Sequence, residues 1–112
     1  MQETEQLVES LALELRRGAV ILAALSRLEE PQYGYYLVQA LQKKGFPIEP
    51  GTLYPLLRRL ENQGLLESSW NTGKNRPRKY YRLSEEGKRV YEALRGEWKS
   101  LVEQINRLID LG

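Results

Sequence analysis

The chain has 112 residues, of which 41% are hydrophobic and 29% charged, a composition typical of one small globular domain. It contains no cysteine and no histidine, which excludes disulfides and thiol nucleophiles and removes the commonest general base and metal ligand. The formal net charge is +2, and no apolar run approaches the length of a membrane span. We therefore expect a cytoplasmic protein that is not an enzyme and holds no metal or cofactor.

The N-terminal part of the chain has the pattern of a helix, expected from about Glu3 to Glu29. Leucines recur there at the spacing of one helix face; they are Leu7, Leu11, Leu15, Leu22, Leu25 and Leu28. The sequence leaves open whether this helix is continuous. A break at Gly18 would make residues 3–17 a separate helix. Pro31 ends the pattern, because proline disfavours the helical conformation in the residue before it.

Two shorter helices are expected next, over residues 33–44 and about 50–63. Each is followed directly by a glycine, the residue that most often ends a helix. In the connection between them, Phe46 and Ile48 either fill the core from a loop or form a minimal strand. The apolar stripe of the second helix consists of Leu53, Leu56, Leu57 and Leu60.

Two runs of aromatic and apolar residues follow, LLESSW (65–70) and RKYYRL (78–83), and both are typical of strands. Glycine, asparagine and proline lie between them, so we expect a β-hairpin. Its tip is basic, because residues 74–82 hold five bases and no acid. Tyr80 and Tyr81 point to opposite faces of their strand, and alternation alone leaves open which one faces the core.

A long final helix is expected after the hairpin. Ser84 is its predicted N-cap, and the helix extends nearly to Leu111. Apolar residues form a heptad seam along it; they are Leu94, Trp98, Leu101, Ile105 and Leu108. This seam and the leucine stripe of the first helix exceed what one small core can cover, so we expect a homodimer.

The predicted order is helix, helix, helix, hairpin and long helix. Two helices joined by a short glycine-containing turn are typical of the helix-turn-helix, and a hairpin directly after them makes a winged helix. The fold class is therefore mainly α with a small β-hairpin. In such a fold the second helix of the pair enters the major groove of DNA, and the hairpin reaches along the backbone.

Three segments also resemble the PadR-like family of transcriptional regulators: YGYYLVQAL (33–41), GTLYPLLRRLENQGLL (51–66) and RPRKYYRLSEEG (76–87). They occur in the order and at the spacing of the family, over roughly residues 18–90. The resemblance implies a dimeric winged-helix repressor whose last helix serves dimerisation, without a separate ligand domain. Family members often have histidine where this chain has Tyr33, which we interpret as a conservative change of a packing residue.

We expect two functional parts, with the boundary between them after residue 83. Residues 1–83 would form the DNA-binding domain, with the recognition helix at about 50–63 and the wing at about 65–83. Residues 84–112 would form the dimerisation helix.

The start of the recognition helix is unusual because it contains two prolines. Pro50 suits the first helical position, where its missing N–H is no loss. If Thr52 is the N-cap, Pro55 falls at the third position and loses no hydrogen bond; if the helix starts at Pro50, Pro55 lies inside it. The resemblance favours the longer helix, with a local distortion at Gly51.

The first turns of the recognition helix hold the candidate DNA-binding residues. Thr52 and Tyr54 would offer hydroxyls, and Gly51 would let the helix end approach DNA closely. The simpler alternative is that Thr52 only caps the helix and Tyr54 only packs. Arg58, one turn further, could contact a phosphate or a guanine, whereas Arg59 faces about 100° away.

The wing supplies the candidate phosphate contacts, namely Lys74, Arg76, Arg78 and Lys79. Arg76, near the tip, could instead enter a minor groove. A solvated basic loop is the alternative for the whole run.

The seam of the last helix is expected to form the dimer interface through Leu94, Trp98, Leu101 and Ile105. Two recognition helices about 34 Å apart would then fit a pseudo-palindromic operator in double-stranded DNA. Two Trp98 side chains near the dimer axis could also line a site for a small, flat hydrophobic effector.

One rival hypothesis is a winged-helix protein-interaction module that binds no DNA. Such a module needs no basic wing, so the KNRPRK run (74–79) argues against it. A small carboxylate enzyme is the other rival, and no convergent pair of acids supports it.

Overall fold

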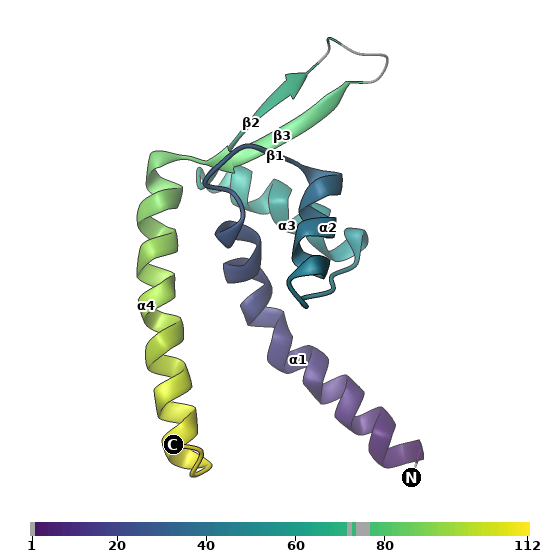
Figure 1. Ribbon diagram of the computed structural model, residues 1–112, viewed down its shortest axis with the longest axis vertical. Coiled ribbons are helices and arrows are strands. Elements are labelled where there is room, and N and C mark those ends of the chain that lie inside the picture. The colour runs from purple at the N-terminus through teal and green to yellow at the C-terminus, as the bar shows by residue number, and fades with distance from the viewer. Residues whose placement is uncertain (1, 72, 74–76) are drawn as a thin grey trace.

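The computed structural model describes residues 2–71, 73 and 77–112. The elements are α1 (Gln2–Ser26), β1 (Gln32–Tyr33), α2 (Gly34–Lys43), α3 (Pro50–Asn62), β2 (Leu66–Asn71), β3 (Arg78–Leu83) and α4 (Glu85–Leu108). Figure 1 shows α1 and α4 extending toward the end of the molecule that carries both termini, while β2 and β3 project at the other end. The predicted fold class, mainly α with a small antiparallel sheet, is confirmed.

The sheet has three strands in the order β1-β3-β2, one more than the predicted hairpin. β1 pairs antiparallel with β3 through Gln32 opposite Tyr81 and Tyr33 opposite Tyr80. A two-residue strand is too short for a period-two pattern, which explains why the sequence does not predict it. Tyr81 is the buried tyrosine of the pair, whereas Tyr80 is half-buried on the other face.

The helix boundaries settle one open alternative and correct one expected end. α1 runs without interruption through Gly18, so residues 3–17 are not a separate helix, and the helix ends at Ser26 rather than near residue 29. Glycine costs about 1 kcal/mol inside a helix, which a 25-residue helix tolerates. α4 ends at Leu108, in agreement with the expectation that it extends nearly to Leu111. Its predicted N-cap is confirmed, because Ser84 Oγ accepts a hydrogen bond from the Gly87 N–H at 2.9 Å.

α3 begins at Pro50 and contains Pro55, so the longer recognition helix is confirmed. Its N-cap is Glu49, whose carbonyl accepts the Thr52 and Leu53 N–H groups at 2.9 and 3.0 Å. Thr52 therefore lies inside the helix, and the alternative in which it is the N-cap is wrong.

The turn before α3 forms no strand, so Phe46 and Ile48 follow the loop alternative. Both side chains are half-buried, and Ile48 packs against the core. Gly45 has a φ of +84°, as expected for the glycine that ends α2.

One core joins α1, α2 and α3 to the sheet. The apolar stripes meet there, and the buried residues are Ala24, Leu25, Leu28, Leu37, Leu41, Leu53, Leu57, Leu60, Leu66, Tyr81 and Leu83. Because the leucines of α3 point into this core, the opposite side of α3 remains at the surface.

Candidate nucleic-acid interface

The exposed side of α3 presents the residues that the sequence analysis singled out. Gly51, Thr52 and Arg58 are exposed, and no side chain caps the helix N-terminus. Arg59 is exposed as well. Gly51 has open space around it, since an added Cβ would meet nothing within 4 Å. The N-terminal turn of α3 is thus accessible to a large ligand.

Tyr54 differs from these neighbours because it is half-buried between α3 and α2. A Cβ placed on Gly34 would lie 3.0 Å from Tyr54 Cε1, so the glycine makes room for the tyrosine ring. Burial raises the pKa of the Tyr54 hydroxyl, and the nearby Tyr33 and Tyr35 raise it further. Tyr54 therefore packs, and it stays a neutral hydrogen-bonding group at physiological pH.

A cluster of tyrosines lies where α2 meets the sheet, and the sequence analysis did not predict it. The Tyr33 ring centre is 5.5 Å from that of Tyr36, 5.9 Å from that of Tyr80 and 6.3 Å from that of Tyr35. The Arg78 guanidinium lies 5.1 Å from the centre of the Tyr33 ring. Tyr35 and Tyr36 are about half exposed. Three tyrosines within four residues are the signal that could have indicated an aromatic surface.

Arg78 is half-buried at the start of β3. Its Nε atom is buried and has no hydrogen-bond partner among the described residues. The guanidinium is therefore restrained by its contact with the Tyr33 ring, and its Nε atom is shielded from solvent.

Lys79, predicted as a phosphate contact, forms an ion pair within the protein. Its Nζ is 3.0 Å from Glu61 Oε1, and the other carboxylate oxygen of Glu61 accepts a hydrogen bond from Ser68. The Ser68 hydrogen bond and then Lys79 hold the pKa of Glu61 below its usual value. Hydrogen bonding to Glu61 raises the pKa of Lys79. Lys74 and Arg76, the other two predicted wing contacts, lie outside the described residues.

The predicted dimer seam is largely exposed in the single chain. Leu94 is half-buried, whereas Trp98, Leu101 and Ile105 are 46%, 48% and 44% exposed. The leucines in the outer half of α1 are also exposed, with Leu15 at 84%. Both apolar stripes are therefore free to contact another molecule.

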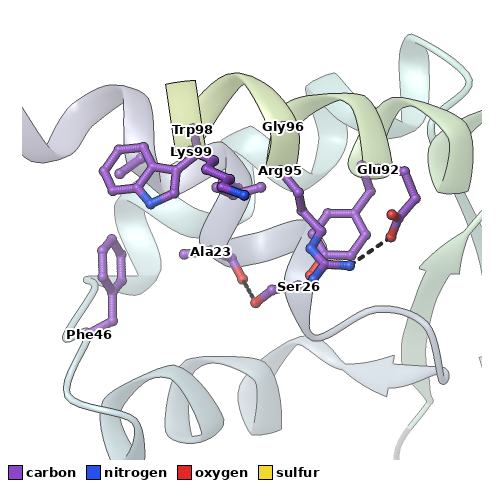
Figure 2. Close-up of a pocket in the computed structure, with 11 residues that line it drawn as sticks. Ala23, Ser26, Phe46, Glu92, Arg95, Gly96, Trp98 and Lys99 are labelled. Atoms are coloured by element: carbon purple, nitrogen blue, oxygen red, sulfur yellow. Dashed lines mark hydrogen bonds and ion pairs between the residues drawn. The ribbon is translucent and has the colours of Figure 1, made fainter. Parts of the chain in front are cut away.

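A cavity of about 770 Å³ lies between α1 and α4, lined in part by Phe46 from the turn before α3. Figure 2 shows the Trp98 and Phe46 rings toward one end of it and the Glu92–Arg95 ion pair toward the other. A second cavity, of about 370 Å³, also contains Trp98 in its lining. Trp98 is thus placed where a bound aromatic molecule would contact it.

Residues 2–71, 73 and 77–112 contain no group of three or more acidic, histidine or cysteine side chains placed to hold a metal ion. In the same residues, no helix combines the length and apolar character needed to cross a membrane.

Comparisons with known proteins agree on one family. The model of the transcriptional regulator PadR-like family matches residues 21–93. A PadR family regulator from Eggerthella lenta has a crystal structure that matches with a TM-score of 0.93 at 46% identity, over 100% of both chains. A transcriptional regulator from Clostridium thermocellum matches with a TM-score of 0.79 at 32% identity, over 84% of this chain and 96% of the other. A transcriptional regulator from Mycobacterium tuberculosis is 34% identical over 82% of this chain and 87% of its own length.

Proposed function

Because the chain belongs to the PadR-like family of transcriptional regulators, we propose that it is a dimeric repressor that binds a specific DNA sequence in the cytoplasm. Proteins of this family regulate transcription and are not enzymes. The observation that carries the proposal is the division of α3 into two sides. Its leucines are buried in the core, while Gly51, Thr52 and Arg58 are exposed.

In this proposal α3 enters the major groove. Gly51 allows close approach, the Thr52 hydroxyl and the helix N-terminus bind a phosphate, and Arg58 reaches a guanine or a phosphate. The Tyr54 ring is held by packing, and its hydroxyl is the group that we assign to a DNA contact.

The wing binds the DNA backbone through Lys74, Arg76 and Arg78. Arg78 is restrained by the Tyr33 ring, and it is the one of the three that lies within the described residues. Each phosphate that is neutralised releases counterions, which makes the affinity sensitive to salt.

Dimerisation would bring two copies of α3 to one operator. The exposed stripes of α1 and α4, including Leu101 and Ile105, supply apolar surface for a second copy. In this arrangement residues 1–83 bind DNA and residues 84–112 form the dimerisation helix. The two recognition helices would lie about 34 Å apart, in successive major grooves of a pseudo-palindrome.

A small hydrophobic effector could relieve repression by binding beside Trp98. Two cavities share this side chain, and the larger one also contacts Phe46 in the turn that leads into α3. An aromatic molecule there would touch both the dimerisation helix and the recognition unit.

The proposal is tested by selecting bound duplexes from a random DNA pool with the purified chain. We expect enrichment of one inverted-repeat sequence. Arg58→Ala should lower affinity for the selected duplex about tenfold or more, the value of one bidentate base contact. Arg59→Ala, which removes the same charge from a neighbouring exposed position, serves as the control and should have a smaller effect. A pool without enrichment would favour the protein-interaction module.

A further inference from the structure

Glu61 joins the recognition helix to both strands of the wing. It lies in the last turn of α3, where Oε1 accepts from Lys79 Nζ at 3.0 Å and Oε2 accepts from Ser68 Oγ. Ser68 pairs with Tyr81 and Lys79 with Trp70, so both donors lie on the same face of the sheet. In the described part of the chain, the side-chain hydrogen bonds from the wing strands to α3 all end on this carboxylate.

The surroundings of the pair distinguish it from an ordinary surface ion pair. The side chains of Lys79 and Glu61 are 27% and 29% exposed, so water screens their attraction less than it screens a fully exposed pair. Lys79 Nζ also lies 5.0 Å from the centre of the Tyr81 ring. Its positive charge is therefore satisfied by the protein rather than left for DNA.

The base of the wing is held elsewhere. The Leu83 N–H donates to the Leu28 carbonyl at 2.8 Å, and the Ser84 N–H donates to the Leu65 carbonyl at 3.0 Å. These bonds hold one end of the hairpin, and β1 holds the outer edge of β3 by pairing with Tyr80 and Tyr81. The Glu61 carboxylate adds a contact on the face of the hairpin that lies toward α3.

We propose that Glu61 is a positioning residue, which acts with Ser68 and Lys79 to fix the angle between the wing and α3. Lys79 is then part of the support of the wing and not a phosphate contact. The proposal rests on the DNA-binding function proposed above, because its purpose is to hold the wing and α3 at the spacing of one duplex.

The geometry indicates how much this support matters. Leu83, at the base, is six residues from Pro77, which is about 20 Å along an extended strand. A rotation of roughly 10° about the base would move that end by about 3.5 Å. Hydrogen bonds weaken steeply beyond about 3.2 Å, so such a rotation would remove phosphate contacts near the tip.

The experiment compares two substitutions that remove the same charge from the same part of the molecule. Glu61→Ala removes the support, whereas Glu67→Ala removes an exposed acid that pairs with Arg82 at 3.1 Å within the hairpin. The probe is the duplex selected from the random pool by the parental chain. Electrostatics alone would raise the affinity of both variants.

We expect Glu61→Ala to bind about tenfold more weakly and with a shallower salt dependence, because wing contacts are lost. Glu67→Ala should bind at least as tightly as the parental chain. Glu61→Gln keeps an acceptor for one hydrogen bond and a similar size, so it should recover most of the affinity. Tighter binding by Glu61→Ala, together with weaker binding by Lys79→Met, would show that Lys79 contacts phosphate and would overturn the proposal.

A second readout needs no DNA. Trp70 lies opposite Lys79 in the sheet, and in a Trp98→Phe background it is the only tryptophan. Its fluorescence anisotropy decay should show larger motion in Glu61→Ala and not in Glu67→Ala. Unchanged motion in Glu61→Ala would overturn the proposal. If the parental chain selects no duplex, the proposed function fails, and the Trp70 measurement still decides whether Glu61 holds the wing.

Discussion

Gly87→Ala is expected to destabilise the protein severely, although alanine favours helices. Gly87 lies in the first turn of α4, and a Cβ at this position would lie 2.0 Å from the Leu65 carbonyl oxygen and 3.3 Å from Leu83 Cδ2. Real Cβ atoms do not approach a backbone oxygen closer than about 3 Å, so α4 must move by about 1 Å or more.

The movement would disturb the junction between the wing and α4. The Ser84 N–H donates to the Leu65 carbonyl at 3.0 Å, and the Ser84 hydroxyl donates to the Gly64 carbonyl at 2.6 Å. Overpacking costs about 1–3 kcal/mol, and weakening a hydrogen bond costs about 1 kcal/mol. The higher helix propensity of alanine relative to glycine offsets about 1 kcal/mol of this loss. We therefore expect a net loss of about 1–3 kcal/mol in the free energy of unfolding.

Urea denaturation followed by circular dichroism measures this loss, with Gly96→Ala as the matched control. Gly96 is also inside α4, but an added Cβ there would meet nothing within 4 Å. Gly96→Ala should therefore raise the free energy of unfolding by about 0.5–1 kcal/mol. If Gly87→Ala were as stable as Gly96→Ala, the close packing of α4 on the Leu65 carbonyl would be refuted.

Four further predictions concern charge, contacts and assembly. The pKa of Glu61 is lowered in the folded chain, so its stabilisation is complete above the ordinary carboxyl pKa and is lost as the pH falls through the lowered value; urea titrations should show the advantage over Glu61→Gln shrinking below about pH 4. Tyr33→Leu should weaken DNA binding about two- to fivefold by releasing Arg78, and Tyr33→Phe should not, as anisotropy titrations would show. Leu101→Glu should produce monomers in sedimentation equilibrium, and a persistent dimer would place the interface elsewhere. Planar hydrophobic compounds should quench tryptophan fluorescence, and Trp98→Ala should abolish the quench; no quench would contradict the effector site.

Local sequence patterns predict most of the fold, because the residues that were expected to begin or end helices lie at the observed helix boundaries. Pro50 begins α3, Ser84 caps α4, and Gly64 follows α3 with a φ of +82°. The sequence leaves open a break at Gly18, and the helix is continuous there because the helical residues on both sides outweigh the low helix propensity of one glycine. The sequence does not predict β1, because its two residues form a strand only through pairing with β3, which is distant in the sequence.

The candidate nucleic-acid interface also has a part that local sequence patterns predict and a part that depends on contacts between distant residues. Helical periodicity predicts which side of α3 is exposed, and Gly51, Thr52 and Arg58 lie there. The pairing of Lys79 with Glu61 joins residues 18 positions apart, and its geometry depends on how the wing packs on α3. No sequence pattern distinguishes such a lysine from one that is free to bind phosphate.

The most direct test of the account is the salt dependence of binding to the selected duplex, measured together with the number of chains bound. With Lys79 held by Glu61, a dimer offers Lys74, Arg76 and Arg78 twice, with or without Arg58. The account predicts two chains per duplex and a slope of log K against log salt between about −5 and −7. A slope near zero, or one chain per duplex, would contradict it.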